Sequence, residues 1–178
     1  MKHIKDFKLF EDAGKHEFGC SMVYFDLPLM EALHKIIDED DIYTDEESDR
    51  SYGLEKEPHT TLLYGLHPEV DDTDVIKRCK PDKPADILLS NASCFENEKY
   101  DVLKMDANAE WLYECNGKLA ELPHITDHPE YQPHATIGYL KKGMGKKYTD
   151  MLRGMEVRVA PGKIVYSKAD GSKIEENI

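Results

Sequence analysis

A chain of 178 residues, 40% of them hydrophobic and 33% charged, is long enough to form one domain with a buried core. Its formal net charge of -13 at pH 7 disfavours a protein that binds long nucleic acid, because a negative surface repels a polyanion. A small phosphate ligand in one local pocket remains compatible with that charge.

The chain contains four cysteines: Cys20, Cys79, Cys94 and Cys115. They form no C-x-x-C pair, so we expect reduced thiols in a cytoplasmic protein. No apolar run approaches the ~20 residues that a membrane span requires, so we expect no membrane contact. Residues 1–17 lack the apolar segment of a signal peptide and predict an N-terminal arm or short helix. Residues 18–178 then form a single domain.

The first half of the chain predicts alternating strands and helices. Residues 18–28 are rich in β-favouring residues and predict a strand that ends at a proline. Residues 29–40 have apolar side chains at helical spacing. Residues 38–57 are acidic and turn-rich, which predicts a loop, either a solvated excursion or a flexible flap beside the site. A strand over 59–66 and a helix over 71–80, with an Asp-rich start, complete this half.

The second half repeats this order and then adds strands. Residues 85–94 and 100–107 predict two strands joined by a polar turn. Helices are expected over 108–122 and 145–155, on either side of a strand over 134–140. Residues 156–160 and 163–168 resemble a closing pair of strands around the sequence PG. The two similar halves indicate an internal duplication around one shared cleft.

The sequence Pro-His-x-Thr occurs three times. The three pairs are His59/Thr61, His124/Thr126 and His134/Thr136. The first and third open apolar, β-favouring runs, whereas two prolines follow the second and break any strand pattern. Residues i and i+2 of a strand point to the same face, so each opening motif presents one imidazole and one hydroxyl together. We therefore pair the first motif with the third, 75 positions later (134 minus 59).

Two imidazoles and two hydroxyls suit phosphodiester chemistry without a metal or cofactor. A neutral histidine can accept a proton from the attacking hydroxyl, and a protonated one can donate to the leaving oxygen. The threonine hydroxyls can donate to the non-bridging phosphate oxygens. We expect His59, Thr61, His134 and Thr136 to be the catalytic set. The sequence leaves open which histidine is the acid and which is the base.

The two tetrads HTTL (59–62) and HATI (134–137) resemble the signature of the 2H phosphoesterase superfamily. This resemblance extends over roughly residues 18 to 168 by element order. It implies an α+β, two-lobed fold, with pseudo-symmetric antiparallel sheets around a central cleft and helices outside. It also implies metal-independent action on 2',3'-cyclic phosphates or other RNA-type phosphodiesters.

Within that superfamily, the blocks FGCSMVYFD, PHTTLLYG, FENEKYDVL and YQPHATIGYL resemble phage anti-CBASS nucleases in content and order. That resemblance implies hydrolysis of the 3'–5' bonds of cyclic di- and trinucleotide immune signals in the host bacterial cytoplasm. The acidic insert at 38–57 departs from the pattern. Two alternatives stay open: a 2',3'-cyclic phosphodiesterase or RNA-end-processing enzyme, and a cyclic-nucleotide sponge that binds without cleaving.

Aromatic side chains near the motifs are candidates for binding the bases of a nucleotide by stacking. Phe95 lies in a polar turn, Phe18 opens the first strand and Tyr131 precedes the last motif by three residues. The basic run 141–147 could attract an anionic ligand, although a solvated loop is the simpler interpretation. We expect no metal site at His124 and its neighbour four residues on, because prolines exclude a helix there.

Overall fold

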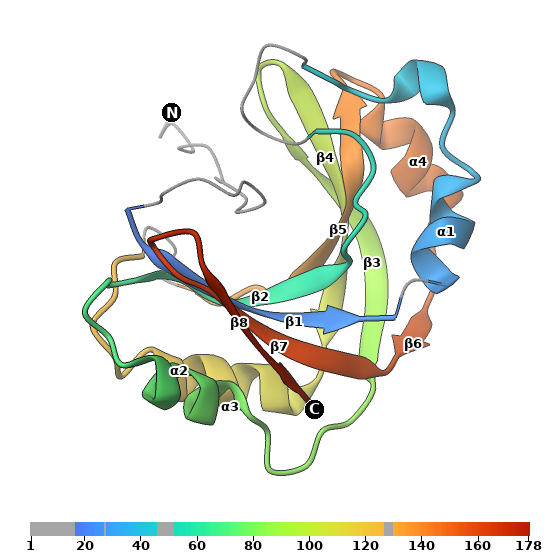
Figure 1. The fold of residues 1–178 in the computed structure, drawn as a ribbon. Coiled ribbons are helices and arrows are strands. Elements are labelled where there is room, and N and C mark those ends of the chain that lie inside the picture. Colours follow the sequence, from blue (N-terminus) through green and yellow to red (C-terminus); the bar gives the residue numbers. More distant parts are fainter. Residues whose placement is uncertain (1–16, 27, 46–51, 127–129) are drawn as a thin grey trace.

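The computed structural model describes residues 17–26, 28–45, 52–126 and 130–178, and Figure 1 shows its helices and strands. The strands are β1 (Gly19–Phe25), β2 (His59–Leu66), β3 (Ile87–Glu96), β4 (Tyr100–Asn108), β5 (His134–Lys141), β6 (Val157–Val159), β7 (Pro161–Ser167) and β8 (Lys173–Asn177). The helices are α1 (Pro28–His34), α2 (Asp72–Cys79), α3 (Glu110–Leu119) and α4 (Gly145–Met151), with a 3-10 turn η1 (Glu39–Asp41). The predicted α+β class with antiparallel strands is confirmed.

The strands form one eight-stranded antiparallel sheet in the order β6-β3-β4-β5-β2-β1-β7-β8. The expectation of separate sheets is therefore corrected, because β2 and β5 join the two groups of four strands. They do so through a single register pair, Thr60 with Ala135. Both residues are the central positions of the H-x-T motifs, so the junction of the sheet coincides with the motifs.

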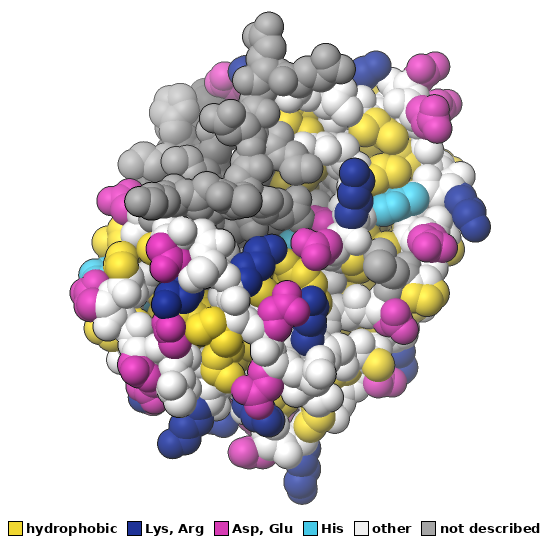
Figure 2. All heavy atoms as spheres, in the orientation of Figure 1, with side chains coloured by type: hydrophobic (Ala, Val, Ile, Leu, Met, Phe, Trp, Pro, Cys, Tyr) yellow, Lys and Arg dark blue, Asp and Glu magenta, His cyan; other side chains and the backbone are white. Residues whose placement is uncertain are grey.

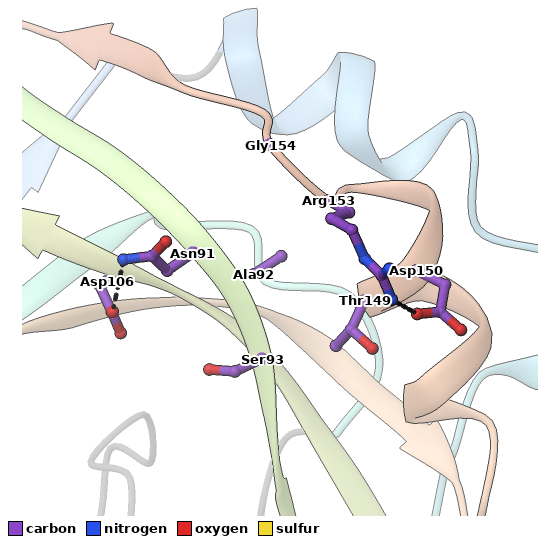
Figure 3. Close-up of a pocket in the computed structure, with 8 residues that line it drawn as sticks. All are labelled: Asn91, Ala92, Ser93, Asp106, Thr149, Asp150, Arg153 and Gly154. Carbon is purple, nitrogen blue, oxygen red and sulfur yellow. Dashed lines mark hydrogen bonds and ion pairs between the residues drawn. The ribbon is translucent and has the colours of Figure 1, made fainter.

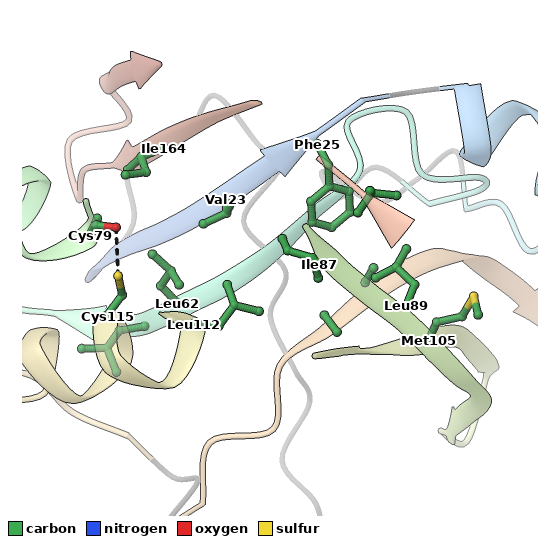
Figure 4. Close-up of a cluster of buried hydrophobic side chains, with 14 of the residues drawn as sticks. Val23, Phe25, Leu62, Cys79, Ile87, Leu89, Met105, Leu112, Cys115 and Ile164 are labelled. Carbon is green, nitrogen blue, oxygen red and sulfur yellow. Dashed lines mark hydrogen bonds between the residues drawn. The ribbon is translucent and has the colours of Figure 1, made fainter. Parts of the chain in front are cut away.

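The main apolar core lies on one face of this sheet, beneath the helices. Alternate residues of each strand contribute to it, such as Leu103, Met105 and Ala107 of β4. Figure 4 shows strand side chains meeting Leu112 and Cys115 of α3, where the Cys115 thiol donates to the Cys79 carbonyl at 3.1 Å. Because side chains alternate along a strand, the intervening residues project from the opposite face.

Each helix that precedes a motif strand packs on the other motif strand. α1 lies between β1 and β2 in the chain but contacts β5, whereas α3 precedes β5 but contacts β2. α2 joins α3, and α4 covers β3 and β4. Figure 1 shows the pair α1 and α4 and the pair α2 and α3 on the outer side of the bent sheet. The two similar halves of the sequence therefore exchange their first helices.

Where β2 and β5 diverge, two short crossing segments pair with the backbone that each strand leaves open. These segments are residues 52–55 and 123–125. Leu54 bridges Gly138 of β5, and His124 bridges Leu66 of β2. Glycine permits this contact in both strands. A Cβ on Gly138 would lie 2.9 Å from the Leu54 side chain, and one on Gly65 would lie 1.8 Å from the Ile125 carbonyl oxygen. The predicted loop 38–57 is thus partly paired backbone.

The C-terminal strands depart from the predicted hairpin. β6 pairs with β3 and β7 pairs with β1, so the two strands around the sequence PG lie in different groups of the sheet. The expectation that they pair with each other is wrong, because each finds a longer apolar partner elsewhere. β8, which the sequence analysis missed, pairs with β7 at the sheet edge. Its sequence, KIEEN, contains one apolar residue and so gives no strong strand signal.

The remaining expectations concern the chain ends and the membrane. The predicted N-terminal arm lies almost entirely outside the described residues, and the boundaries of a single domain over 18–178 stay a prediction. Among the helices in the described ranges, none is both long and apolar enough to cross a bilayer.

Candidate active site

The junction of β2 and β5 brings the two H-x-T motifs together. Thr60 and Ala135 pair there, and both are buried on the helix-covered side. Their neighbours His59, Thr61, His134 and Thr136 therefore share the opposite face, which we call the histidine face. In an antiparallel pair the register sum is constant, so continuing this register would set His59 opposite Thr136 and Thr61 opposite His134. Directly opposed side chains have Cβ atoms about 5 Å apart.

The same hydrogen bond orients the ring in both motifs. The Nδ1 of His59 lies 2.8 Å from the Glu57 carbonyl oxygen, and that of His134 lies 2.9 Å from the Gln132 carbonyl oxygen. Because a carbonyl oxygen can only accept, Nδ1 carries the hydrogen in each ring. In the neutral imidazole Nε2 is then the nitrogen that can accept a proton. Both rings are thus held in the tautomer that general acid–base chemistry at Nε2 requires.

His124, in the third copy, has the same ring hydrogen bond but another location. Its Nδ1 lies 2.8 Å from the Leu122 carbonyl oxygen. Its backbone pairs with Leu66, at the far end of β2 from His59. Seven residues separate those two positions of β2, a distance of about 23 Å along a strand. The structure therefore keeps His124 away from the other two motifs.

His134 lies among charged groups contributed by β4. Lys104 pairs in register with Thr136, and Asp106 pairs with His134 itself. Burial lowers the pKa of His134 to about 4, and the positive charges of Lys104 and His59 add to that effect. The hydrogen bond to Gln132 and the charge of Asp106 oppose it. His134 is therefore neutral near pH 7.

His59 lies against an aromatic ring rather than among charges. It is 5% exposed, and its ring stacks on Tyr24 of β1 at a centroid distance of 5.3 Å and an angle of 25°. The Lys163 ammonium lies 5.3 Å from the centroid of the Tyr24 ring and pairs with Glu175 at 2.8 Å. The Tyr24 ring therefore contacts both the His59 imidazole and the Lys163 ammonium.

Phe95 is the predicted base-binding residue whose ring contacts a motif imidazole. Its ring contacts the His134 ring edge to face, with centroids 5.3 Å apart and planes at 82°. The Lys104 ammonium lies 4.9 Å from the centroid of the Phe95 ring and 3.0 Å from an Asp106 carboxylate oxygen. Phe95 is the penultimate residue of β3, one residue beyond the strand that the sequence predicts, and it is partly exposed.

Phe18 and Tyr131 lie further from the reacting groups. Phe18 packs against His67 at a ring distance of 5.8 Å, beyond the far end of β2. Tyr131 donates its hydroxyl to the Thr61 carbonyl oxygen at 2.9 Å, and burial raises its pKa. Its ring also contacts Tyr113. Tyr131 therefore supports the backbone of β2, and a direct contact of either residue with a base stays a prediction.

Sequence reasoning missed Lys104, Asp106 and Tyr24 as neighbours of the histidines. A usable signal existed in the strand YDVLKMDAN, where Lys104 and Asp106 interrupt an apolar run at a spacing of two. That spacing places both on one face, opposite the buried core. Only the register of β4 with β5 reveals that this is the histidine face.

Two cavities are lined by residues close to the motifs in register or in sequence. The larger, of about 360 Å³, lies at the edge of β3 between Asn91, Ser93 and Asp106 on one side and Arg153 of the α4 region on the other (Figure 3). The smaller, of about 240 Å³, lies between the first crossing segment and Tyr139 of β5. The first reaches the site through Asp106, and the second reaches it through Glu57, whose carbonyl holds His59.

The basic run 141–147 begins at the end of β5 opposite to His134, and its charges are paired locally. Within the basic run 141–147, Lys142 lies 3.6 Å from Asp101 and Lys147 lies 2.6 Å from Asp41. Figure 2 shows acidic and basic side chains interspersed on the face it presents. In the part of the chain that the structure describes, no group of three or more His, Cys, Asp or Glu side chains could hold a metal ion. The second histidine of the candidate pair at His124 lies outside that part.

The sequence matches no family model and no curated protein. Two solved structures of Usb1 from Kluyveromyces marxianus have a similar fold. The first aligns with a TM-score of 0.56 at 11% identity, over 92% of this chain and 99% of that one. The second, of Usb1 with uridine monophosphate, aligns with a TM-score of 0.51 at 11% identity, over 91% and 98%. The chain therefore has a Usb1-like fold along nearly its whole length.

Proposed function

We propose that this protein is a metal-independent phosphodiesterase of the 2H type, with His59, Thr61, His134 and Thr136 as its catalytic residues. The observation that carries the proposal is the single pair Thr60–Ala135, which aligns two H-x-T motifs on one face of the sheet. The two groups of four strands correspond, in this proposal, to the two lobes of a pseudo-symmetric fold, and the histidine face lines the cleft between them.

The structural likeness supports the proposed reaction class. One of the two similar Usb1 structures contains uridine monophosphate, a nucleotide. Our assignment of that reaction class to this chain rests on its own residues, because 11% identity carries only the fold. Two imidazoles in the same tautomer, each beside a threonine hydroxyl of the neighbouring strand, form the arrangement that phosphodiester cleavage needs.

Different surroundings suggest different roles for the two histidines. His134 is neutral near pH 7, so we assign it as the base that removes the proton from the substrate 2'-hydroxyl. The 2'-oxygen forms a bond to phosphorus as the bond to the 5'-oxygen breaks, and protonated His59 gives its Nε2 proton to that oxygen. The product is a 2',3'-cyclic phosphate. Water then opens this ring, with the two histidines exchanging their roles.

A bound phosphodiester also adjusts the basicity of His134. With a pKa of about 4, the imidazole of the empty site is a weak base. A nearby negative phosphate favours the protonated imidazole and raises that pKa toward the working pH. Thr61 and Thr136 donate to the non-bridging oxygens, and Lys104 supplies a positive charge next to Thr136. Charge on these oxygens in the transition state is thereby stabilised.

We assign cyclic di- and trinucleotides as the substrates. Aromatic rings border both histidines, with Tyr24 at His59 and Phe95 at His134, so a ligand with two or more bases could contact both groups of strands. The net charge of -13 disfavours long RNA. A 2',3'-cyclic mononucleotide is the second candidate, favoured by the nucleotide in the similar Usb1 structure.

The test is incubation with EDTA and a panel of cyclic di- and trinucleotides, 2',3'-cyclic nucleotides and short RNA, with products resolved by chromatography. We expect cleavage of the cyclic signals by the wild type and its loss in His59→Ala and His134→Ala. Cleavage of 2',3'-cyclic nucleotides or RNA ends alone would select the second candidate. Intact cyclic ligand recovered after heat denaturation would indicate a sponge.

A substrate analogue tests the chemical route separately. Replacing the 2'-hydroxyl of the substrate by hydrogen removes the proposed nucleophile, so we expect no cleavage of that analogue. Unchanged cleavage would exclude the cyclic phosphate route and indicate direct attack by water.

A further inference from the structure

The smaller cavity has an aromatic wall. Tyr52 and Tyr139 line it, with ring centroids 5.3 Å apart and planes at 85°. Both rings belong to a cluster separate from the main core, in which Tyr43 and Tyr100 also contact Tyr52 at 5.0 Å and 5.2 Å. Tyr139 is 3% and Tyr100 is 6% exposed, so the partly exposed Tyr52 provides the accessible part of this aromatic wall.

The cavity lies on the histidine face because of a register shift in β5. Lys104 pairs with Thr136, and two residues earlier on β4, Val102 pairs with Tyr139. Two residues of β4 thus correspond to three of β5, so the bulge turns Tyr139 to the same side as Thr136. Three residues of strand span about 10 Å, so a ligand in the cavity lies near the catalytic hydroxyl.

Glu55 is the buried acidic residue among those that line this cavity. It is only 4% exposed. Its Oε1 accepts from the Glu57 amide at 2.7 Å, whereas its Oε2 has no hydrogen-bond partner among the residues that the structure describes. A buried carboxyl oxygen without a hydrogen-bond partner destabilises its surroundings. Such an oxygen beside an aromatic wall can be compensated by a ligand that donates a hydrogen bond.

We propose that this cavity is a nucleobase subsite that selects bases with an exocyclic amino group, with Glu55 as the acceptor and Tyr52 and Tyr139 as the aromatic wall. The proposal rests on the proposed function, since it names the base that the site prefers. A cavity of about 240 Å³ is smaller than the ~300–1,000 Å³ of a site for a drug-sized ligand, so it suits one base rather than a whole dinucleotide.

The chemistry of Glu55 decides between bases. An ionised carboxylate only accepts, so its Oε2 favours the amino groups of adenine, cytosine and guanine. Uracil places carbonyl oxygens on both sides of its single N–H group, and these oxygens would face the carboxylate. Cytosine and uracil have the same ring size, so a preference between them reports hydrogen bonding rather than stacking.

The experiment measures binding of CMP and UMP to the full-length protein by isothermal titration calorimetry at fixed ionic strength. We expect CMP to bind about tenfold more tightly than UMP, because the second ligand leaves the buried oxygen unpaired. In Glu55→Gln the side-chain oxygen can still accept from the Glu57 amide, and the new amide donates into the cavity. The preference for CMP should then disappear or reverse.

The matched control is Glu57→Gln, which removes a carboxylate from the same cavity but at an exposed position. It should keep the preference for CMP. Equal affinities of the wild type for CMP and UMP would overturn the subsite, as would an equal change in the two variants, which would indicate only a general charge effect.

A parallel assay of cyclic dinucleotide cleavage separates this subsite from the proposed function. Cleavage without a base preference contradicts the subsite and leaves the function standing. A preference that depends on Glu55, without cleavage of any phosphodiester, contradicts the function and leaves the subsite standing. If the protein shows neither cleavage nor a base preference, both the proposed function and the subsite are contradicted.

Discussion

β2 and β5 present the same motif with the same ring hydrogen bond, yet their histidines differ in electrostatic surroundings. His59 is buried against the ring of Tyr24, whereas His134 lies beside Lys104 and Asp106 and has a pKa lowered to about 4. The two motifs therefore share the same backbone hydrogen bond to the imidazole but differ in the charged side chains around it. In the proposed reaction, two imidazoles in identical surroundings would have no fixed acid and base roles, whereas unequal neighbours assign a different role to each.

The supports of the two strands show the same partial symmetry. A crossing segment contacts a glycine of each motif strand, Leu54 at Gly138 and Ile125 at Gly65. The two contacts differ in distance and in kind. The nearest atom to a Cβ on Gly138 would belong to the Leu54 side chain, whereas the nearest atom to a Cβ on Gly65 would be the Ile125 carbonyl oxygen, which is closer. The repeated scaffold therefore fixes where the two motifs meet, while individual side chains determine what each motif does.

The largest expected effect tests the equivalence of the motifs. His59→Ala and His134→Ala should each lower kcat/KM for a cyclic dinucleotide by about 10²–10⁴-fold, because each removes one proton-transfer group. His124→Ala should stay within about twofold of the wild type, since its ring hydrogen bond is the same but its position is remote. Steady-state kinetics measures all three. A loss in the His124 variant as large as in the others would break the assignment of the pair.

The threonines test whether both motifs hold the phosphate. Thr61→Val and Thr136→Val should each lower kcat by about 10²-fold with little change in KM, because the hydroxyls stabilise charge mainly in the transition state. Urea unfolding of each variant checks that the fold is retained. If one variant keeps full activity, only one of the two threonines contacts the phosphate. The proposal that both motifs hold it would then be wrong.

The two glycines test the difference between the crossing segments. Gly65→Ala should lower the free energy of unfolding by roughly 2–4 kcal/mol, because φ is +95° and the new Cβ would lie 1.8 Å from the Ile125 carbonyl oxygen. Gly138→Ala should cost about 1–2 kcal/mol, since the Leu54 side chain can move. Urea titration provides both values.

Gly117→Ala in α3 is the matched control for the glycine pair. Its Cβ would meet nothing within 4 Å, so alanine should stabilise the helix by about 0.5–1 kcal/mol. Equal costs for the Gly65 and Gly138 variants would show that the two segments are equivalent after all.

The smallest expected effect tests the electrostatic asymmetry. The activity of the wild type should fall as the pH drops through the pKa of His134, because the protonated imidazole cannot act as a base. Lys104→Met removes a charge that disfavours protonation, so the acid limb of the kcat/KM profile should move up by roughly half a unit to one pH unit. Lys163→Met, near Tyr24, should leave that limb in place. Equal shifts in both variants would remove the distinction between the histidines.

Much of the local structure could be predicted from the sequence. β2 was predicted at its observed limits, because a proline precedes the histidine and an apolar, β-favouring run follows it. The Asp-rich start of α2 was also predictive, since the Asp71 side chain accepts from the Asp74 amide at 3.1 Å. The same local evidence excluded His124 from a strand. Local evidence was weaker for β8, where charged residues alternate with only one apolar residue.

Local residue patterns alone indicate which residues open strands and which side chains share a face. Both features depend on neighbouring positions, through proline geometry and the two-residue period of a strand. Three features are visible only in the folded protein. β6 and β7 pair with different strands, the sheet is continuous through Thr60 and Ala135, and Lys104 lies beside His134. These outcomes depend on the register between strands distant in the chain. Register is set by packing across the whole sheet, so no short stretch of residues contains it.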